Sequence, residues 1–350
     1  MSALAFISWF ADIGLVDRAQ VGGKGGSLGE LQRAGIAVPP GFVIGTGAFE
    51  RFLASVEEHS SVRDRIGTLP HEDLVAVTEC SNTLRALMER APFPADLRAD
   101  ILDARAALCA KAPATAVAVR SSATTEDAGD ASFAGLQDTF LWVKATDQLL
   151  HSIRRCWSSL YSTESITYRR RLGIPEHRVS MAVVIQVMVD ARTAGVMFTR
   201  SPTTGDRSVI SVEGSWGLGS AVVGGEVTPD RWVISKVTGE ISVREISDKA
   251  LQHLPMEAGG VATSPVPESL RRTPCLHDDE LGQLRTLARR VEQHYQHAQD
   301  IEWAVDRQAG NILVLQSRPE TVWSARDSAP LAQAEEAAHH HVMKLFRGGR

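Results

Sequence analysis

Apolar and polar side chains alternate along residues 300–319, DIEWAVDRQAGNILVLQSRP, and this pattern predicts a two-stranded hairpin. Ile301, Trp303 and Val305 fall at every second position of the first strand, which is the spacing of a strand with one buried face. A second alternating run follows a turn at residues 307–311, where a Gly-Asn pair is a turn signal. We therefore expect the two strands to share one polar face.

One register of this hairpin brings a carboxylate and an amide side chain together. If Ala304 pairs with Val314, Glu302 lies opposite Gln316 on the same face, because strand side chains repeat every second residue. A carboxylate on an otherwise apolar ribbon is costly to bury unless it is paired or holds a cation. Glu302 and Gln316 offer oxygen ligands of the kind that Mg²⁺ accepts, so they are candidate metal ligands.

The same register sets Asp300 opposite Arg318. The planar guanidinium of Arg318 suits phosphate. An edge hairpin with a surface Asp–Arg pair accounts for the pattern equally well, because polar faces are common on strands. From the residues alone, both interpretations stay open.

Helical and strand-like patterns separate along the rest of the chain. Between residues 46 and 112, apolar side chains recur at three- and four-residue spacing, which predicts a helical block without a reactive grouping. Apolar runs typical of strands follow, as in Met181–Val189 and Ala194–Thr199. We therefore expect an α+β chain in three parts: a first lobe with the helical block over residues 1–184, a second lobe with the hairpin over residues 185–325, and a C-terminal tail or docking helix over residues 326–350.

The sequence also predicts the structure of two other segments. Residues 149–171 predict one helix, with Trp157 and Tyr161 turned inward and a basic, solvated end at residues 169–171. Residues 257–273 are rich in Gly, Pro and Ser, which is typical of a surface loop.

The stretch Gly22–Gly26 places four glycines around Lys24. Ser27 can cap a helix over residues 28–34, so the glycines would lie in a loop at a helix start. Backbone N–H groups in such a loop, together with a lysine, suit phosphate. The stretch is not a Walker A loop, because GxxxxGK[ST] is absent. A flexible turn with a solvent-exposed lysine is the alternative.

A buried strand over residues 116–119 should deliver Arg120 at its end, and serines and threonines follow directly. The small, polar run that continues to Gly135 predicts a mobile loop. An arginine at a strand end beside hydroxyl groups is a good phosphate clamp. A capping-rich loop with a structural Arg–Glu pair is the alternative.

Bulk composition narrows the function classes. The 350 residues are 43% apolar and 23% charged, the ordinary range of a globular protein, and the formal net charge of -5 gives no basic face for nucleic acid. The four cysteines form no CxxC pair, which is typical of reduced thiols in a cytoplasmic protein. We see no signal-peptide pattern and no apolar run long enough to span a bilayer, so we expect no membrane partner.

Several motifs follow one another in a fixed order: VGGKGGSLGEL with VPPGFVI, VRSSATTEDAGDASFAGLQDTF, AGVMFTRSPTTG, WGLGSAVVGGEVTPDRW, and DIEW with VLQSRPET. Together they resemble the ATP-binding region of the phosphoenolpyruvate synthase and pyruvate phosphate dikinase family. The resemblance runs over roughly residues 6–323 and implies an ATP-grasp fold in which two lobes clamp ATP. One position departs: Ser220 stands where the family usually has Glu after GLG.

The resemblance also implies a role for each candidate residue. Lys24 and Arg120 would contact the phosphates of ATP and, with Arg318, take part in catalysis. Glu302 and Gln316 would hold Mg²⁺, and Arg318 would hold phosphate. The adenine would lie beside the strand that joins the lobes, at Gln186, Met188 and Val189.

A partner is implied as well. Related full-length enzymes pass the β-phosphate of ATP to a histidine on a swivelling domain, which yields AMP and phosphate, and then to an acceptor. None of the eleven histidines here sits in the usual T-S-H-type motif. We therefore expect a separate subunit or domain to carry the phosphohistidine and to bind a small-molecule acceptor, and the chain to be inactive without it. The acceptor would be phenol if the chain is a subunit of phenylphosphate synthase, or pyruvate.

Other functions stay open. Rifampin phosphotransferase and phosphoenolpyruvate synthase share the ATP-region motifs, but there the domains are fused. A nucleotide-sensing module would bind ATP without transfer, and an ATP-grasp ligase would release ADP. Product analysis separates these classes, because the dikinase reaction yields AMP plus phosphate.

Overall fold

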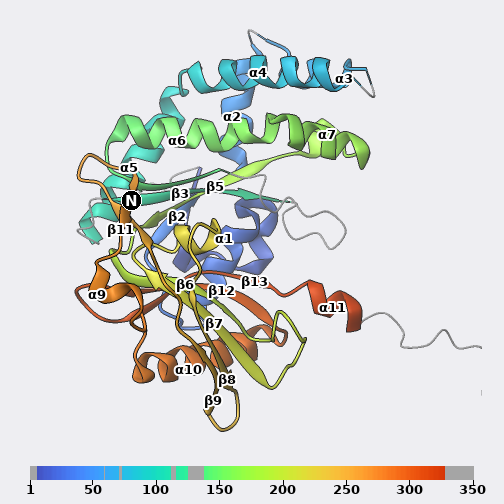
Figure 1. Ribbon diagram of the computed structural model, residues 1–350. Coiled ribbons are helices and arrows are strands. Elements are labelled where there is room, and N and C mark those ends of the chain that lie inside the picture. Colours follow the sequence, from blue (N-terminus) through green and yellow to red (C-terminus); the bar gives the residue numbers. More distant parts are fainter. Residues whose placement is uncertain (1–5, 59, 71–72, 112–115, 125–137, 328–350) are drawn as a thin grey trace, which may run out of the picture.

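The computed structural model describes residues 6–58, 60–70, 73–111, 116–124 and 138–327, and they form two main antiparallel sheets with helices around them (Figure 1). The first sheet has the strand order β1-β2-β5-β3-β4. Its strands are β1 Ile7–Trp9, β2 Gly41–Ile44, β3 Val117–Ala123, β4 Thr139–Val143 and β5 Met181–Val187. The fold is thus a mixture of helix and sheet, which confirms the predicted class at that level.

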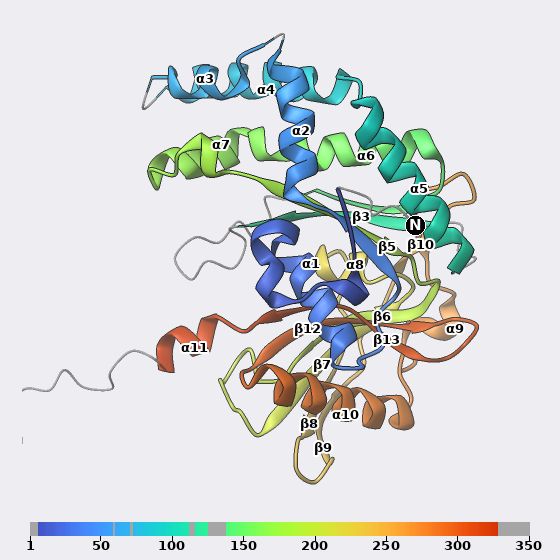
Figure 2. The same ribbon diagram turned by 180° about the vertical axis from the view of Figure 1, so that it is seen from behind.

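Helices stack above the first sheet, with α4 lying over α6 and α7 (Figures 1 and 2). The ring of Trp157 is fully buried there and lies 5.0 Å from the ring of Phe52 between centroids. Its Nε1 donates to the carbonyl of Met181 in β5, which ties the helical layer to the sheet. The helices of this layer are α2 Thr46–Glu57, α3 Val62–Gly67, α4 Leu74–Arg90, α5 Ala95–Lys111, α6 Thr146–Ser158 and α7 Thr163–Arg171.

The segment predicted as one helix over residues 149–171 is divided. A 3-10 turn, Ser159–Tyr161, separates α6 from α7, while Trp157 and Tyr161 are buried as predicted. The prediction of a solvated basic end is wrong for Arg169, because that side chain is fully buried and pairs with Glu176 at 2.9 Å. Burial of a guanidinium is tolerated here because a carboxylate compensates its charge.

The second sheet has the order β13-β12-β6-β7-β8-β9 and is covered on one face by helix α10, Asp278–Tyr295 (Figure 1). Its core is built by Trp232, Trp303 and Leu284, which are all fully buried. It forms a hydrophobic cluster separate from that of the first sheet. The strands are β6 Ala191–Phe198, β7 Val209–Trp216, β8 Asp230–Ser235, β9 Ile241–Glu245, β12 Gln299–Asp306 and β13 Ile312–Pro319.

Helix α1, Arg18–Arg33, lies between the two sheets and contains the glycine-rich stretch that the sequence placed in a loop (Figure 1). It is broken at Gly22, whose φ is 70°. A Cβ at Gly22 would lie 2.2 Å from the backbone oxygen of Ser122 in β3, so only glycine permits this approach. Ser27 is not a cap but lies inside the helix and donates to the carbonyl of Ser317 in β13 at 2.7 Å. The helix therefore contacts both sheets.

Residues 257–273, predicted as a surface loop, hold regular structure instead. Strands β10, Leu251–Pro255, and β11, Val261–Pro265, form a hairpin, and Gly259 and Gly260 take positive φ values at its tip. The tip reaches the first sheet, since Gly260 N donates to the carbonyl of Trp142 in β4 at 2.9 Å. The remaining elements are the helices α8 Ser220–Val223, α9 Glu268–Arg271 and α11 Val322–Asp327, and the 3-10 turns Phe10–Asp12, Leu15–Asp17 and Glu176–Arg178.

The predicted boundary between the two lobes does not fall between elements of the structure. The limit at residues 184/185 lies inside β5, which continues in the first sheet to Val187. The predicted tail, residues 326–350, and the predicted mobile loop up to Gly135 lie largely outside the described residues. Over the part of the chain that the structure describes, no helix has the length and apolarity needed to cross a membrane.

Candidate functional site

A cavity of about 780 Å³ lies between the two sheets. Its walls come from α1, β3, β4 and the end of β5 on one side, and from β6, β12, β13 and the start of α8 on the other. The structure therefore brings together residues that are up to about three hundred positions apart in the sequence. All the sequence-predicted site residues line this cavity: Lys24, Arg120, Gln186, Met188, Val189, Glu302, Gln316 and Arg318.

The hairpin of β12 and β13 has the predicted register at the site but not beyond it. Glu302 is paired with Gln316 as predicted, whereas Ala304 pairs with Leu313 and not with Val314. The register shifts after Glu302, so one residue of β13, Leu315, is left without a partner in the ladder. Such bulges are frequent beside active sites, because they free a backbone group from the ladder.

Arg120 uses the freed group and joins the two sheets. Its Nη1 donates to the carbonyl of Leu315 at 3.0 Å, and its Nη2 donates to Glu302 Oε2 at 3.0 Å and to Gln316 Oε1 at 2.5 Å. The residue is 8% exposed, and its Nε is buried without a hydrogen-bond partner. The strand does not end before Arg120 as predicted, since β3 continues to Ala123.

The oxygens of Glu302 and Gln316 thus converge on one cationic group. A carboxylate and an amide oxygen suit Mg²⁺, which is usually held by one or two protein oxygens plus phosphate oxygens of the substrate. Across the described ranges, no group of three or more His, Cys, Asp and Glu side chains could hold a metal alone. The oxygens of Glu302 and Gln316 therefore fit a metal whose remaining ligands would come from a phosphate group.

Asp300 is a cavity residue that the sequence analysis did not assign to the site. Its carboxylate accepts from Nε of Arg318 at 3.3 Å, and both residues line the cavity. Burial raises the pKa of Asp300 to about 6, although Arg318 acts in the opposite direction. The pair is therefore not a simple surface pair. The sequence could have assigned Asp300 to the site, because it lies two positions before Glu302 and therefore on the same face of the strand.

Lys24 reaches the cavity from α1, which is positioned by its contacts with β3. Gly25 N donates to Oγ of Ser122 at 3.2 Å, and that hydroxyl donates to the carbonyl of Val21 at 2.9 Å. The predicted loop is thus a helix start fixed against a strand, and it places Lys24 on the same wall as Arg120.

Part of the cavity wall is apolar and includes Met188, Val189 and Ala191. Gln186, Met188 and Val189 lie where the chain passes from β5 to β6, and so from one sheet to the other. Met188 N donates to the carbonyl of Ala116 at 3.1 Å, which holds the crossing segment against β3. This arrangement suits a flat group beside the crossing segment.

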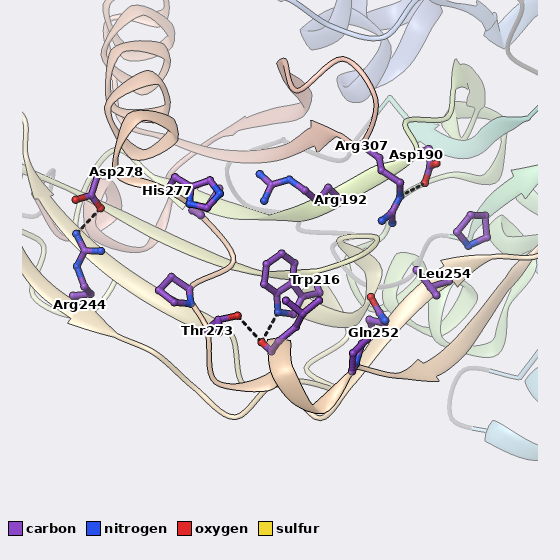
Figure 3. A pocket seen from close by; sticks show the side chains of 15 residues that line it. Asp190, Arg192, Trp216, Arg244, Gln252, Leu254, Thr273, His277, Asp278 and Arg307 are labelled. Carbon is purple, nitrogen blue, oxygen red and sulfur yellow. Dashed lines mark hydrogen bonds and ion pairs between the residues drawn. The ribbon is translucent and has the colours of Figure 1, made fainter.

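A second cavity, of about 1000 Å³, lies on the second sheet and also gathers charged residues (Figure 3). Arg244 pairs there with Asp278 at 2.7 Å, and Arg307 pairs with Asp190 at 3.2 Å. Arg192 from β6 lies on the same wall. The sequence-predicted residues line the other cavity, so the larger cavity is not where the predicted chemistry gathers.

The chain matches a known family and several curated relatives. The family model for the pyruvate phosphate dikinase AMP/ATP-binding domain matches residues 18–339. The chain is 36% identical over 344 residues to a probable phosphoenolpyruvate synthase of Methanocaldococcus jannaschii, and 39% identical over 318 residues to one of Methanothermobacter thermautotrophicus. It is 40% identical over 311 residues to a rifampicin phosphotransferase of a Streptomyces species.

These alignments cover most of this chain but a minor part of each relative. They span 98%, 90% and 89% of the chain and 29%, 46% and 35% of the respective relatives. The chain thus corresponds to less than half the length of these relatives. The resemblance seen in the motifs is confirmed, and the chain belongs to the family of pyruvate phosphate dikinase AMP/ATP-binding domains.

Proposed function

We propose that the chain binds MgATP between two lobes of an ATP-grasp fold, one built on each sheet, as the ATP-binding component of a dikinase-type phosphotransferase. The observation that carries the proposal is the meeting of cationic and oxygen-donor side chains from both sheets in one cavity. The family membership and the names of the relatives, phosphoenolpyruvate synthase and rifampicin phosphotransferase, support ATP-dependent phosphoryl transfer.

The cationic residues would bind and polarise the phosphates. Lys24 from α1 and Arg120 from β3 act from one sheet, and Arg318 from β13 acts from the other. Phosphoryl transfer depends mainly on positioning and on neutralising charge, so groups aimed at the transferring and leaving phosphates supply most of the catalysis. Arg120 would exchange its bonds to Glu302 and Gln316 for bonds to phosphate oxygens when the nucleotide enters.

Glu302 and Gln316 would hold Mg²⁺ once Arg120 has moved to the phosphates. A metal held by these two side chains would offset the negative charge of the phosphates. The adenine would lie against the crossing segment at Gln186, Met188 and Val189, because the apolar side chains of Met188 and Val189 and the amide of Gln186 suit a flat base with polar edges.

A histidine on a separate subunit or domain would receive the β-phosphate, with AMP and phosphate as products. The same histidine would pass the phosphoryl group to a small acceptor, for which phenol, pyruvate and rifampicin are the candidates to test. The chain alone would then bind ATP without turnover.

Calorimetry of the full chain with MgATP tests the binding step, and we expect saturable one-site binding that Arg120→Ala weakens. Product analysis with a histidine-bearing partner then tests the chemistry. AMP plus phosphate supports the dikinase reaction. ADP would point to a ligase, and binding without any turnover in the presence of partner and acceptors would point to a nucleotide sensor.

A further inference from the structure

Strand β13 is the outer strand of the second sheet, and α1 holds one of its backbone carbonyls from outside that sheet (Figure 2). The carbonyl of Ser317 accepts from Oγ of Ser27 at 2.7 Å. The two residues are 3% and 7% exposed, so little water competes for this bond. The outer edge of a sheet offers carbonyls that no strand takes, and a side chain that binds one fixes where the strand lies. Ser27 therefore joins α1 to β13.

The side chain of Ser317 continues this connection into the sheet. Its Oγ donates to Oε1 of Gln299 in β12 at 2.7 Å. Gln299 is 1% exposed, and its backbone is held at the end of β6, where its N–H donates to Oγ1 of Thr199 at 2.8 Å and its carbonyl accepts from Thr199 N at 3.0 Å. Ser317 is thus held by its carbonyl to a helix and by its hydroxyl to the next strand.

The residues of this network adjoin two of the cations that line the cavity between the sheets. Lys24 lies three positions before Ser27 in α1, and Arg318 directly follows Ser317 in β13. On the side of the first sheet, α1 is held by the hydroxyl of Ser122 in β3, as described above. The helix that carries Lys24 is therefore fixed to both sheets by serine hydroxyls, and the second attachment also sets its place relative to Arg318.

We infer that Ser27, Ser317 and Gln299 are positioning residues, which hold Lys24 and Arg318 at the spacing that binds the phosphates of one nucleotide from two sides. The inference rests on the proposed function. Two cations reach one phosphate chain at full strength only when the distance between them is set before the ligand arrives. The hydroxyls of Ser27 and Ser317 are bonded to protein groups, so these residues act through the two cations.

Calorimetry of the full chain with MgATP and with adenosine tests the inference, because adenosine has no phosphate for the two cations to bind. Ser27→Ala should weaken MgATP binding about threefold to tenfold, the range for the loss of one hydrogen bond. The affinity for adenosine should stay within about twofold of the wild type, because the base and sugar do not depend on this spacing. A role in stability alone would not separate the two ligands in this way.

Two further variants serve as controls. Ser27→Thr keeps the hydroxyl, so it should restore most of the affinity for MgATP. Ser159→Ala removes a bond of the same kind in the helical layer, where a 3% exposed hydroxyl donates to the carbonyl of Cys156 at 2.7 Å. This variant should bind both ligands as the wild type does, because its hydroxyl is in contact with neither α1 nor β13.

A double-mutant cycle tests whether Ser27 acts through Lys24. In a Lys24→Ala background, Ser27→Ala should change MgATP affinity by less than about twofold, because the group that it positions is gone. Ser317→Ala removes only the bond to Gln299, and it should show the same dependence on Arg318 in a cycle with Arg318→Ala. This second cycle carries the test if Ser27→Ala does not fold.

Additive losses in both cycles overturn the inference, and so does equal weakening of MgATP and adenosine by Ser27→Ala. If neither serine variant folds, the bonds serve the fold and not the spacing, and the inference fails too. Failure of the wild type to bind MgATP would overturn the proposed function itself. Normal MgATP binding by the wild type and by both serine variants would overturn this inference alone.

Discussion

Two cavities of this protein gather arginines and acids, and they hold these charges differently. In the cavity between the sheets, Arg120 is 8% exposed, and its partners Glu302 and Gln316 come from the other sheet. In the cavity of Figure 3, Arg244 and Asp278 form a pair whose side chains are 39% and 71% exposed. Both cavities have similar residue types, and the Arg120–Glu302 pair is more buried than the Arg244–Asp278 pair.

Solvent explains why that difference matters. An exposed ion pair is screened by water and salt and contributes little free energy. A buried guanidinium has lost its water and must be paired, so it keeps its partner until another anion is offered. A ligand that brings phosphate and a cation can satisfy both Arg120 and Glu302 at once. The comparison indicates that a buried ion pair between two elements, and not the number of charged residues, distinguishes the candidate site.

Replacing Glu302 should give the largest effect. We expect Glu302→Gln to lower the rate of AMP formation, measured with a histidine-bearing partner, by about a hundredfold or more, the range for loss of one preorganised charge-stabilising group. The substitution keeps a hydrogen-bond acceptor for Arg120, so folding should be preserved. Asp278→Asn, which changes an acid of the exposed cavity in the same way, should leave the rate unaltered. Near-normal turnover in Glu302→Gln would contradict the metal-ligand role.

Ligand binding should raise the stability of the protein through the buried cavity alone. Free MgATP at a hundred times its Kd adds about 2.7 kcal/mol to the free energy of unfolding of a protein that binds it only when folded. Thermal melts should show this gain with MgATP and a smaller one with ATP plus EDTA. Arg120→Ala should abolish most of the gain and Arg244→Ala should retain it. An equal loss in both variants would mean that the nucleotide contacts the exposed cavity too.

Asp300 should make stability depend on pH. Burial raises its pKa from 3.8 to about 6 in the folded state, so the folded protein holds this proton more tightly than the unfolded chain. The stability that the protonated group contributes is therefore present below about pH 4 and is lost as pH rises through 6, by about 2–3 kcal/mol. Urea unfolding of Asp300→Asn should lack this decrease and so gain on the wild type between pH 4 and pH 7. The same pH dependence of stability in Asp300→Asn and in the wild type would contradict this role of Asp300.

The hairpin illustrates how far the sequence could lead. Alternation places Asp300, Glu302, Gln316 and Arg318 on one face, and the register assumed for the hairpin pairs them as the structure does, although its Ala304–Val314 pair is wrong. The bulge at Leu315 could not be predicted in this way. The carbonyl of Leu315 at the bulge accepts a hydrogen bond from Arg120, which is 195 positions away in the sequence. Local patterns do not carry that contact.

Two further differences have the same cause. The sequence predicts a loop around Lys24 because Ser27 can cap a helix over residues 28–34, yet these glycines lie within α1, and Gly22 is required by the approach of Ser122 from β3. Ser220 and His253 are 33 positions apart in the sequence. The bridge between Gly217 and His253 of β10 brings them within hydrogen-bond distance. Local sequence patterns identify candidate site residues by their type and spacing. Their hydrogen-bond partners are set by contacts between elements that are distant in the sequence.

The smallest change in stability is expected for the exposed ion pair between Arg244 and Asp278. Arg244→Ala removes an ion pair at 2.7 Å, but both side chains are in contact with solvent, so the free energy of unfolding should fall by less than about 1 kcal/mol. Urea titration with Arg120→Ala alongside measures the contrast, because that variant leaves Glu302 and Gln316 in the cavity without their shared partner and should lose more. The loss for Arg244→Ala should also shrink in high salt. A loss of several kcal/mol from Arg244→Ala would mean that exposure does not separate the two cavities, and the Figure 3 arginines would then have to be treated as a second buried network with its own ligand.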